Sequence, residues 1–485
     1  MTIARLFFWI VVAAGLTAIV YTGVWHMFVL FAWQHPMLSW LPLLAVIVVG
    51  FLAAGVRNLA GAGARPLPNP KAFEKMASGI TSAKLRERVE KMQRRRARFA
   101  LGWGLLAGLA VLAAGLLFTL LSPPASGLSE IDYELVDELP QRTQPRLLPR
   151  ASVDDDPRFT DVGETHLVRD PETGELMWSA EWQPALLSGP SQGVVTKPLD
   201  DVLSESSIHE GGFDHSVSAI APNTLKGQAK IKHPFSRTQY PVLIPTGEGT
   251  AVAIAPYVGY KGFPFRYPYL KGVLVYHRDG TIEDLTPEEA AARPELARSG
   301  RIFPEAVARA QAEALARSDE FKGKIIDGDG NKQPYLTAID AERTVWVTII
   351  SEKGGSNLAK AVVLADSTTG KTQVWRPGAG ERLVSTQEAI NEARALPLRW
   401  EERRCCDSDG HSYTVTLREV AEPRLAFKDG DPYYLVSVVP TDDLALPREI
   451  EYTLIVDGRT GETIRELNHV SGGGLADRQL QRFFK

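Results

Sequence analysis

The sequence predicts three transmembrane helices followed by an α+β ectodomain, built from repeated antiparallel hairpin modules with intervening helices. Two observations lead to this fold class. Apolar runs near 6–33, 40–56 and 99–121 flank a strongly cationic segment. After them, β-branched and aromatic residues alternate with polar ones in successive pairs of strands, which is typical of antiparallel sheets with one buried face.

The apolar runs are expected to cross a bilayer, whose hydrocarbon core requires roughly 20 apolar residues in a helix. Residues 1–56 are assigned two spans and residues 99–121 a third, which contains no charged residue. A cleaved signal peptide is the alternative for the first run. Its apolar stretch is longer than a usual signal core, however, and no small-residue cleavage site follows it.

The segment between the second and third runs, residues 57–98, carries a net charge of +9. Loops rich in Lys and Arg remain cytoplasmic. This predicts a multi-pass plasma-membrane protein with a cytoplasmic N-terminus and an extracytoplasmic part at 122–485. Four cations of the loop are expected to contact the inner leaflet, namely Arg94, Arg95, Arg96 and Arg98. A nucleic-acid arm is the alternative, but no aromatic residues are interleaved with these cations.

The part that follows is acidic. Because residues 1–121 carry +10 and the whole chain −4, residues 122–485 carry −14, which disfavours binding to nucleic acid or anionic lipid. Residues 122–160 are rich in Pro and acidic side chains and predict an extended linker. The rest divides into a β-rich region at 161–300 and two α+β modules, at 301–380 and at 381–485 with the tail.

Three strand pairs recur, at 249–258 with 271–285, at 344–351 with 359–375, and at 431–440 with 450–467. Turns of the type D-x-x-T-G or R-D-G-T interrupt them, and a further such turn lies within 166–178. Helices are predicted at 303–318 and 385–396. The second begins at Ser385 with Glu388 three residues later, which is typical of a capping box.

The combination of a helix with E-A-x-x-x-A, a strand and V-x-D-x-x-T-G-x-T resembles PepSY-type modules of bacterial envelope proteins. The matching residues are Glu388, Ala389 and Ala393 with Ile455, Asp457, Thr460, Gly461 and Thr463, and in a second set Glu305, Ala306 and Ala310 with Leu364, Asp366, Thr369, Gly370 and Thr372. The resemblance covers about residues 300–470. It implies cystatin-like α+β folds that bind or regulate partners, often peptidases, outside the cell.

Signatures of zinc peptidases, Walker-type nucleotide-binding loops and dinucleotide-binding loops do not occur in the sequence. The nine His residues show no spacing that suggests a metal site. We therefore expect a protein that is not an enzyme and has no cofactor.

The cysteines of the chain are two adjacent residues, Cys405 and Cys406, and they are followed by Asp407, Asp409 and His411. Three outcomes are open for them. They could be structural or redox-inert as a vicinal pair, bridge to a second protomer, or bind a soft metal together with His411.

Six aromatic residues crowd one Gly- and Pro-rich segment, namely Tyr257, Tyr260, Phe263, Phe265, Tyr267 and Tyr269. Aromatic anchors dominate recognition hot spots, so this segment is a candidate partner- or glycan-facing edge. The alternative is that the rings cover the adjacent sheet.

Together these features predict a non-enzymatic, membrane-anchored extracytoplasmic scaffold or regulator that binds a protein partner at the bacterial cell envelope. The alternative function is an extracytoplasmic ligand sensor that signals to the basic loop. Beyond a protein partner, the expected contacts are the lipid bilayer and a second copy of the chain, through the membrane helices or through Cys405 and Cys406. Nucleic acid is not expected as a partner.

Overall fold

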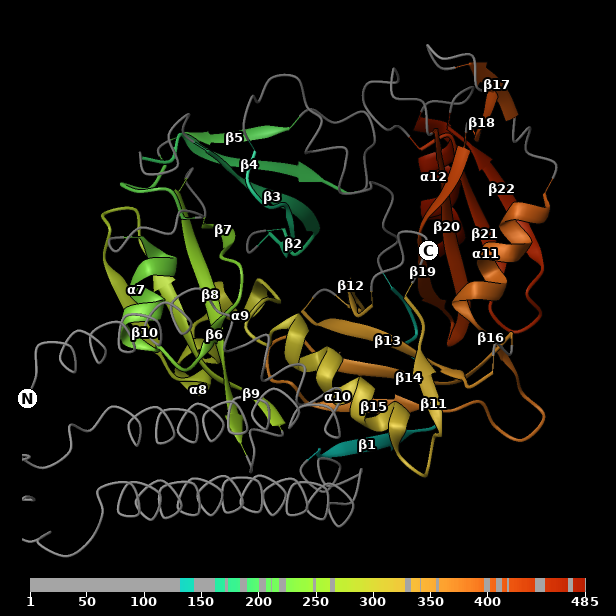
Figure 1. Ribbon diagram of the computed structural model, residues 1–485, viewed down its shortest axis with the longest axis horizontal. Helices are drawn as coiled ribbons and strands as arrows, with labels where there is room; N and C mark the ends of the chain where they lie inside the picture. The colour runs from blue at the N-terminus through green and yellow to red at the C-terminus, as the bar shows by residue number, and fades with distance from the viewer. Residues whose placement is uncertain are drawn as a thin grey trace, which may run out of the picture. The chain divides into compact units, whose positions relative to one another are not determined.

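A computed structural model of the chain describes residues 131–143, 162–170, 173–183, 190–199, 206–210, 212–217, 224–246, 250–261, 267–327, 333–340, 342–354, 357–396, 402–406, 412–416, 418–440, 450–469 and 474–484. These residues all belong to one compact unit. They form 22 strands in five sheets, together with six helices (Figure 1).

The N-terminal half of the described chain contains two sheets that share a core. The first is a four-stranded antiparallel meander, β2 (His166–Arg169), β3 (Leu176–Trp182), β4 (Gly193–Pro198) and β5 (Ser207–Glu210). The second has the order β10-β9-β8-β6, with β7 also paired to β8. Its strands are β6 (Arg237–Thr238), β7 (Val242–Thr246), β8 (Thr250–Lys261), β9 (Tyr267–Tyr276) and β10 (Ile282–Leu285).

Three short helices accompany these sheets, α7 (Leu225–Lys232), α8 (Pro287–Ala291) and α9 (Pro294–Arg298). Leu225 and Ala229 of α7 lie in one buried cluster with Val194 of β4, Leu243 of β7 and Leu274 of β9. The two sheets and α7 are therefore held together by one apolar core.

The C-terminal half contains a seven-stranded sheet with the path β1-β15-β14-β13-β11, to which β12 and β16 add pairs. Its strands are β1 (Tyr133–Val136), β11 (Gly323–Ile325), β12 (Tyr335–Ala338), β13 (Thr344–Glu352), β14 (Leu358–Asp366), β15 (Thr372–Trp375) and β16 (Leu383–Val384). β1 pairs with β15 in parallel, whereas the other pairs are antiparallel.

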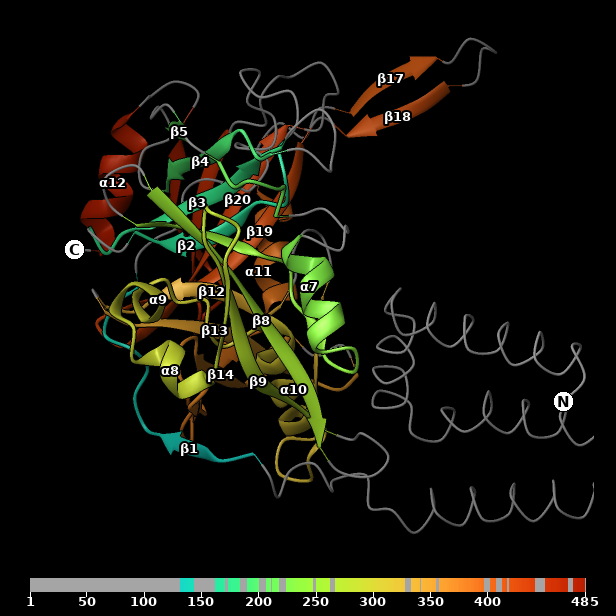
Figure 2. The same cartoon turned by 90° about the vertical axis from the view of Figure 1, so that its left-hand side faces the viewer.

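A four-stranded antiparallel meander completes the described part, with β19 (Arg418–Lys428), β20 (Asp431–Pro440), β21 (Tyr452–Asp457) and β22 (Thr463–Asn468) in that order. Between α11 (Thr386–Ala395) and β19 lies a separate hairpin of β17 (Glu402–Cys406) and β18 (Ser412–Thr416), visible in Figure 2. The helices of this half are α10 (Glu305–Arg317), α11 (Thr386–Ala395) and α12 (Gly474–Phe484).

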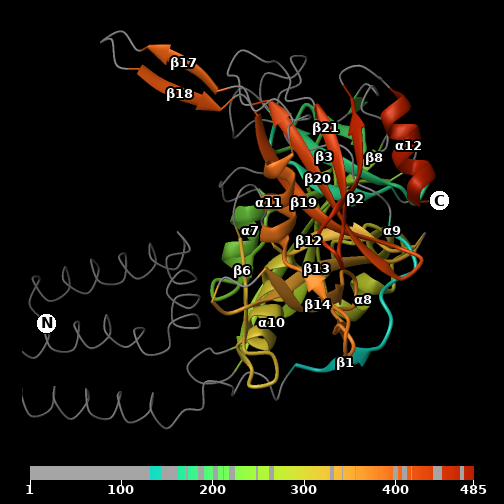
Figure 3. The ribbon, with the colours of Figure 1, turned by 90° about the vertical axis from the view of Figure 1, so that its right-hand side faces the viewer.

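The largest core lies between the seven-stranded sheet and the four-stranded sheet of β19 to β22. It joins Val347 of β13 and Leu364 of β14 to Val436 of β20 and Leu454 of β21, and α11 contributes Ala389. The opposite faces of the two sheets are covered by separate helices. Residues of α10 pack on β13, β14 and β15, and residues of α12 pack on β19 to β22 (Figure 3).

The two modules repeat one local device at the start of their helices. The N–H of Phe303, the residue before the N-cap of α10, donates to the Ser367 carbonyl at 2.7 Å. The N–H of Val384, the residue before the N-cap of α11, donates to the Gly458 carbonyl at 2.8 Å. Ser367 and Gly458 each follow the Asp of a D-x-x-T-G turn. Each turn is thereby tied to the beginning of its module's helix.

The turns themselves are built alike. The carboxylate of Asp366 accepts from the N–H groups of Thr368 and Thr369, at 3.0 and 2.7 Å. The carboxylate of Asp457 likewise accepts from the N–H groups of Arg459 and Thr460, at 2.7 and 2.9 Å. Gly370 and Gly461 close the turns with φ of 76° and 85°. The Asp and Gly positions of the motif therefore have a backbone role, as expected for such turns.

The two helices also bury alanines at equal distances from their N-caps. Counted from their N-caps, Pro304 and Ser385, the buried residues Ala308 and Ala312 of α10 correspond to Ala389 and Ala393 of α11. The PepSY-type resemblance instead matches Ala306 and Ala310 to Ala389 and Ala393. The difference arises because the E-A pair lies two positions closer to the cap in α10 than in α11.

The predicted strands and both predicted helices are present, but the predicted fold class is wrong. The described residues are mainly β, and their six helices are few and short, with 13 residues in the longest. Sheets rather than alternating helices form the layers, because most core residues come from strands. The described part is a mainly β fold and not an α+β ectodomain.

The predicted membrane placement is also contradicted as far as the structure describes the chain. Across the described residues, no helix combines the length and apolar composition that a membrane crossing requires. The segments predicted to span, 6–33, 40–56 and 99–121, lie outside the described residues. The basic loop at 57–98 lies outside them as well.

Replacing Gly370 with Ala is expected to destabilise the protein more than replacing Gly354. Both have positive φ, 76° and 104°, which costs an L-residue about 1–2 kcal/mol. At Gly370 an added Cβ would also lie 2.4 Å from the Phe303 ring, whereas nothing lies within 4 Å of it at Gly354. Urea unfolding followed by tryptophan fluorescence should give the lower midpoint for Gly370→Ala. An equal loss of stability in the two variants would contradict the packing of this turn against Phe303, just before α10.

Candidate functional site

Of the six predicted aromatic residues, the structure buries one, partly buries two and describes no side chain for the other three. Tyr257 is 5 % exposed and belongs to the core under β8 and β9. Tyr260 packs against a neighbouring core cluster, and Tyr269 lies beneath Lys261, whose ammonium is 4.4 Å from the ring centroid. Tyr267 begins β9, opposite Lys261. Phe263 and Phe265 lie outside the described residues.

Exposed apolar side chains lie instead on the segment of chain that runs from α7 through β6. Ile231, Phe235 and Tyr240 are 57 %, 68 % and 56 % exposed. They are three of the seven large hydrophobic side chains that the described residues expose, and they fall within ten positions of one another. We call the stretch Thr224–Tyr240 the α7–β6 surface. Figure 2 shows α7 at the side of β8.

The local sequence explains this conformation. The Thr224 hydroxyl accepts from the Gly227 N–H at 3.2 Å and caps α7, while Leu225 and Ala229 are buried. The His233 N–H donates to the Ala229 carbonyl at 2.8 Å and ends the helix. Pro234 follows and prevents continuation of the helix. The chain then enters β6, which pairs with Tyr257 and Val258 of β8.

The same stretch is positively charged. Between Thr224 and Tyr240 the sequence contains Lys226, Lys230, Lys232 and Arg237 and no Asp or Glu. The Lys226 ammonium lies 4.3 Å from the Tyr240 ring centroid. Burial lowers the pKa of Lys226 and Lys230, and for Lys226 the carboxylates of Glu164 and Glu181 oppose this. The absence of acidic residues within a strongly acidic domain is the signal in the sequence that would have located this surface.

His233 of this surface forms a connected set with Asp284 of β10 and Tyr257 of β8. The Asp284 carboxylate lies 2.7 Å from His233 Nε2 and accepts from the Tyr257 hydroxyl at 2.9 Å. The His233 and Tyr257 rings stack at 4.1 Å between centroids. Burial and the bond to Asp284 raise the pKa of Tyr257, which keeps its hydroxyl a donor. These contacts tie the end of α7 to β8 and β10, so we assign this set a structural role.

The chain contains one sequence typical of hydrolases, G-x-S-x-G at Gly189–Gly193. In hydrolases the serine of this motif lies on a sharp turn between a strand and a helix. Ser191 is instead 6 % exposed and lies between β3 and β4, with its N–H donating to the Phe213 carbonyl at 2.9 Å. The structural context of a nucleophile elbow is therefore not met.

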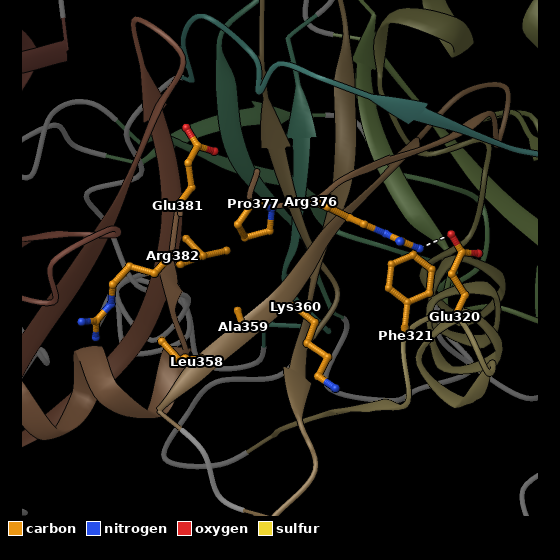
Figure 4. Close-up of a pocket in the computed structure, with 10 residues that line it drawn as sticks. Glu320, Phe321, Leu358, Ala359, Lys360, Arg376, Pro377, Glu381 and Arg382 are labelled. Atoms are coloured by element: carbon orange, nitrogen blue, oxygen red, sulfur yellow. Dashed lines mark hydrogen bonds and ion pairs between the residues drawn. The ribbon is translucent and has the colours of Figure 1, made fainter. Parts of the chain in front are cut away.

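A pocket of about 300 Å³ lies at the end of α10, beside β14, β15 and β16 (Figure 4). Its charged side chains pair with neighbours and do not converge. Arg376 points toward Glu320 and lies over the Phe321 ring at 4.1 Å, and Arg382 points away from both. Glu381 pairs with Arg459 at 2.9 Å. This arrangement offers no common centre for a charged ligand.

The other predicted sites fall on residues whose side chains the structure does not describe. Cys405 and Cys406 end β17, opposite Tyr413 and Ser412, and His411 lies outside the described residues. Arg94, Arg95, Arg96 and Arg98 also lie outside them. Within the described ranges, no group of three or more His, Cys, Asp or Glu could hold a metal ion. The three alternatives for the cysteines remain predictions.

No protein-family model matches the sequence, and no curated protein matches it. Among solved structures, the chain is similar to a protein from Parabacteroides distasonis assigned as a glycoside hydrolase, with 11 % identity and a TM-score of 0.17 over 69 % of this chain and 79 % of that chain. An ACO/RPE65 chimera gives 11 % identity and a TM-score of 0.17 over 68 % of each chain. At these scores neither likeness supports an argument about fold or function.

Replacing Tyr257 with Phe is expected to lower the free energy of unfolding by about 1 kcal/mol, because Asp284 loses a hydrogen-bond donor while the stacked ring remains. Tyr240→Phe is the matched control, since its ring is exposed and the cation–π contact with Lys226 is retained. Chemical denaturation of both variants checks this. A loss at Tyr240 equal to that at Tyr257 would argue against the buried set.

Proposed function

We propose that this protein is a non-enzymatic scaffold or regulator that binds a protein partner through the α7–β6 surface. The observation that supports this most is the exposure of Ile231, Phe235 and Tyr240 together on one short stretch. Exposed apolar groups rimmed by charged ones are typical of protein-interaction sites, and aromatic and cationic residues are enriched there.

The architecture supports a binding role in a second way. Two consecutive modules repeat the helix, the strands and the D-x-x-T-G turn, which is the arrangement that led to the resemblance with PepSY-type modules. We propose membership of that class for residues 300–470. Modules of that class are associated with binding or regulating partners, which supports a binding role for the chain, although the α7–β6 surface lies outside residues 300–470.

The proposal predicts that a photo-crosslinking residue at position 235 captures one defined protein in cells. The same residue at position 464 is the control, because Ile464 is another exposed apolar side chain, 46 % exposed on β22. Position 464 is expected to capture none of that protein, because it lies on a different sheet. Identical products from both positions would contradict a specific site.

Once that protein is purified, the double variant Ile231→Ser/Phe235→Ser is expected to bind it about tenfold more weakly or worse, because central apolar anchors carry most of the binding energy. Ile464→Ser should leave the affinity unchanged. Circular dichroism and thermal unfolding of both variants establish that the fold is intact. Unchanged affinity in the double variant would rule out this surface as the binding site.

A further inference from the structure

We infer that the partner segment recognised by the α7–β6 surface is an acidic peptide segment that carries apolar anchor residues. This inference rests on the proposed function and adds the chemistry of the partner. It is carried by the juxtaposition of exposed apolar side chains with a stretch of sequence that contains four cations and no Asp or Glu. Lys232 and Arg237 lie three residues before and two residues after Phe235, the most exposed large apolar side chain described.

The position of the cations is only partly explained by local helix stability. Lys230 and Lys232 lie in the last turn of α7, where positive charge is favourable next to the helix C-terminus. Arg237 belongs to β6 and is outside that influence. Neither does helix stability require Phe235 and Tyr240 to face solvent. A ligand that is both anionic and apolar accounts for all of these residues at once.

The surface is also held in place before any partner binds. His233, in the middle of the stretch, is fixed by Asp284 at 2.7 Å and by stacking on Tyr257. The Ser236 N–H donates to the His233 carbonyl at 3.0 Å, and the Gln239 N–H donates to the Pro256 carbonyl at 2.9 Å. These contacts fix the backbone of the stretch, which lowers the entropic cost of binding at this surface.

The size of the charged region selects a short peptide rather than a long polyanion. The stretch carries four cations, while residues 122–485 as a whole carry −14. Nucleic acids are attracted by extended positive potential and repelled by a net negative domain. A short acidic segment instead contacts the cations locally, and its apolar residues bury the exposed side chains. Complementary charge then determines specificity and association rate.

The test uses the full chain and a short fluorescein-labelled peptide in which Glu alternates with Leu and Phe. Anisotropy should show saturable binding that weakens as salt is raised, because exposed charges are screened. Four competitors define the chemistry. A peptide with Lys in place of Glu should not bind, polyglutamate should bind about tenfold more weakly for want of apolar anchors, and single-stranded DNA or anionic phosphatidylserine vesicles should bind no better than polyglutamate.

The matched variants are the double charge reversals Lys232→Glu/Arg237→Glu and Lys324→Glu/Lys353→Glu. Lys324 and Lys353 are exposed cations near β11 and the end of β13, in another part of the fold. The first double variant is expected to lose about tenfold or more in peptide affinity and the second to lose none. Equal affinity for the acidic and basic peptides, preference for DNA or vesicles, or no effect of the first double variant would each overturn the inference.

The outcome separates this inference from the proposed function. Suppose that the crosslinked protein no longer binds Ile231→Ser/Phe235→Ser, but that its binding is insensitive to Lys232→Glu/Arg237→Glu and to salt. The scaffold role then remains, and the acidic segment is refuted. Specific binding of the acidic peptide without any protein crosslinked at position 235 supports the recognition chemistry and refutes the scaffold role.

Discussion

The packing of the seven-stranded sheet against the four-stranded sheet of β19 to β22 is the constraint on which the rest of the described structure depends. Twenty-one buried side chains from the seven-stranded sheet, the β19–β22 sheet and α11 form one apolar cluster together with Leu139. Burying apolar area on this scale is the main favourable term in folding. The cluster also contains two tyrosines whose hydroxyls must be satisfied, since an unpaired buried polar group is costly.

Both tyrosines bond to the backbone of another element. The Tyr335 hydroxyl of β12 accepts from the Leu425 N–H of β19 at 2.6 Å, at the irregularity in the β19–β20 pairing. The Tyr434 hydroxyl of β20 donates to the Val384 carbonyl of β16 at 2.7 Å. Burial raises the pKa of each phenol. The two sheets are therefore joined by directional bonds as well as by apolar contact, which fixes their alignment.

The edges of the two sheets are protected in different ways. In the seven-stranded sheet, β15 is not an edge because β1 pairs with it in parallel, and β1 is the terminal strand on that side. In the four-stranded sheet, β22 is the terminal strand, and its pairing with β21 shifts register between Ile455 and Val456. A bulge and charged side chains such as Arg465 and Glu466 discourage further strand addition at an edge.

The sequence by itself determined the local elements. The two-residue alternation located the strands, the capping pattern at Ser385 located α11, and the D-x-x-T-G turns follow from the backbone preferences of Asp and Gly. Local periodicity could not give the fold class, because α8 and α9 have five residues each and the layers arise from sheets that meet across long sequence distances. Only the tertiary structure decided which aromatic residues face solvent. Tyr257 is buried because α7 and β4 cover its face of β8, while Phe235 follows the end of α7, where no described element covers it. Burial depends on neighbours supplied by distant parts of the chain, and a local pattern contains no information about them.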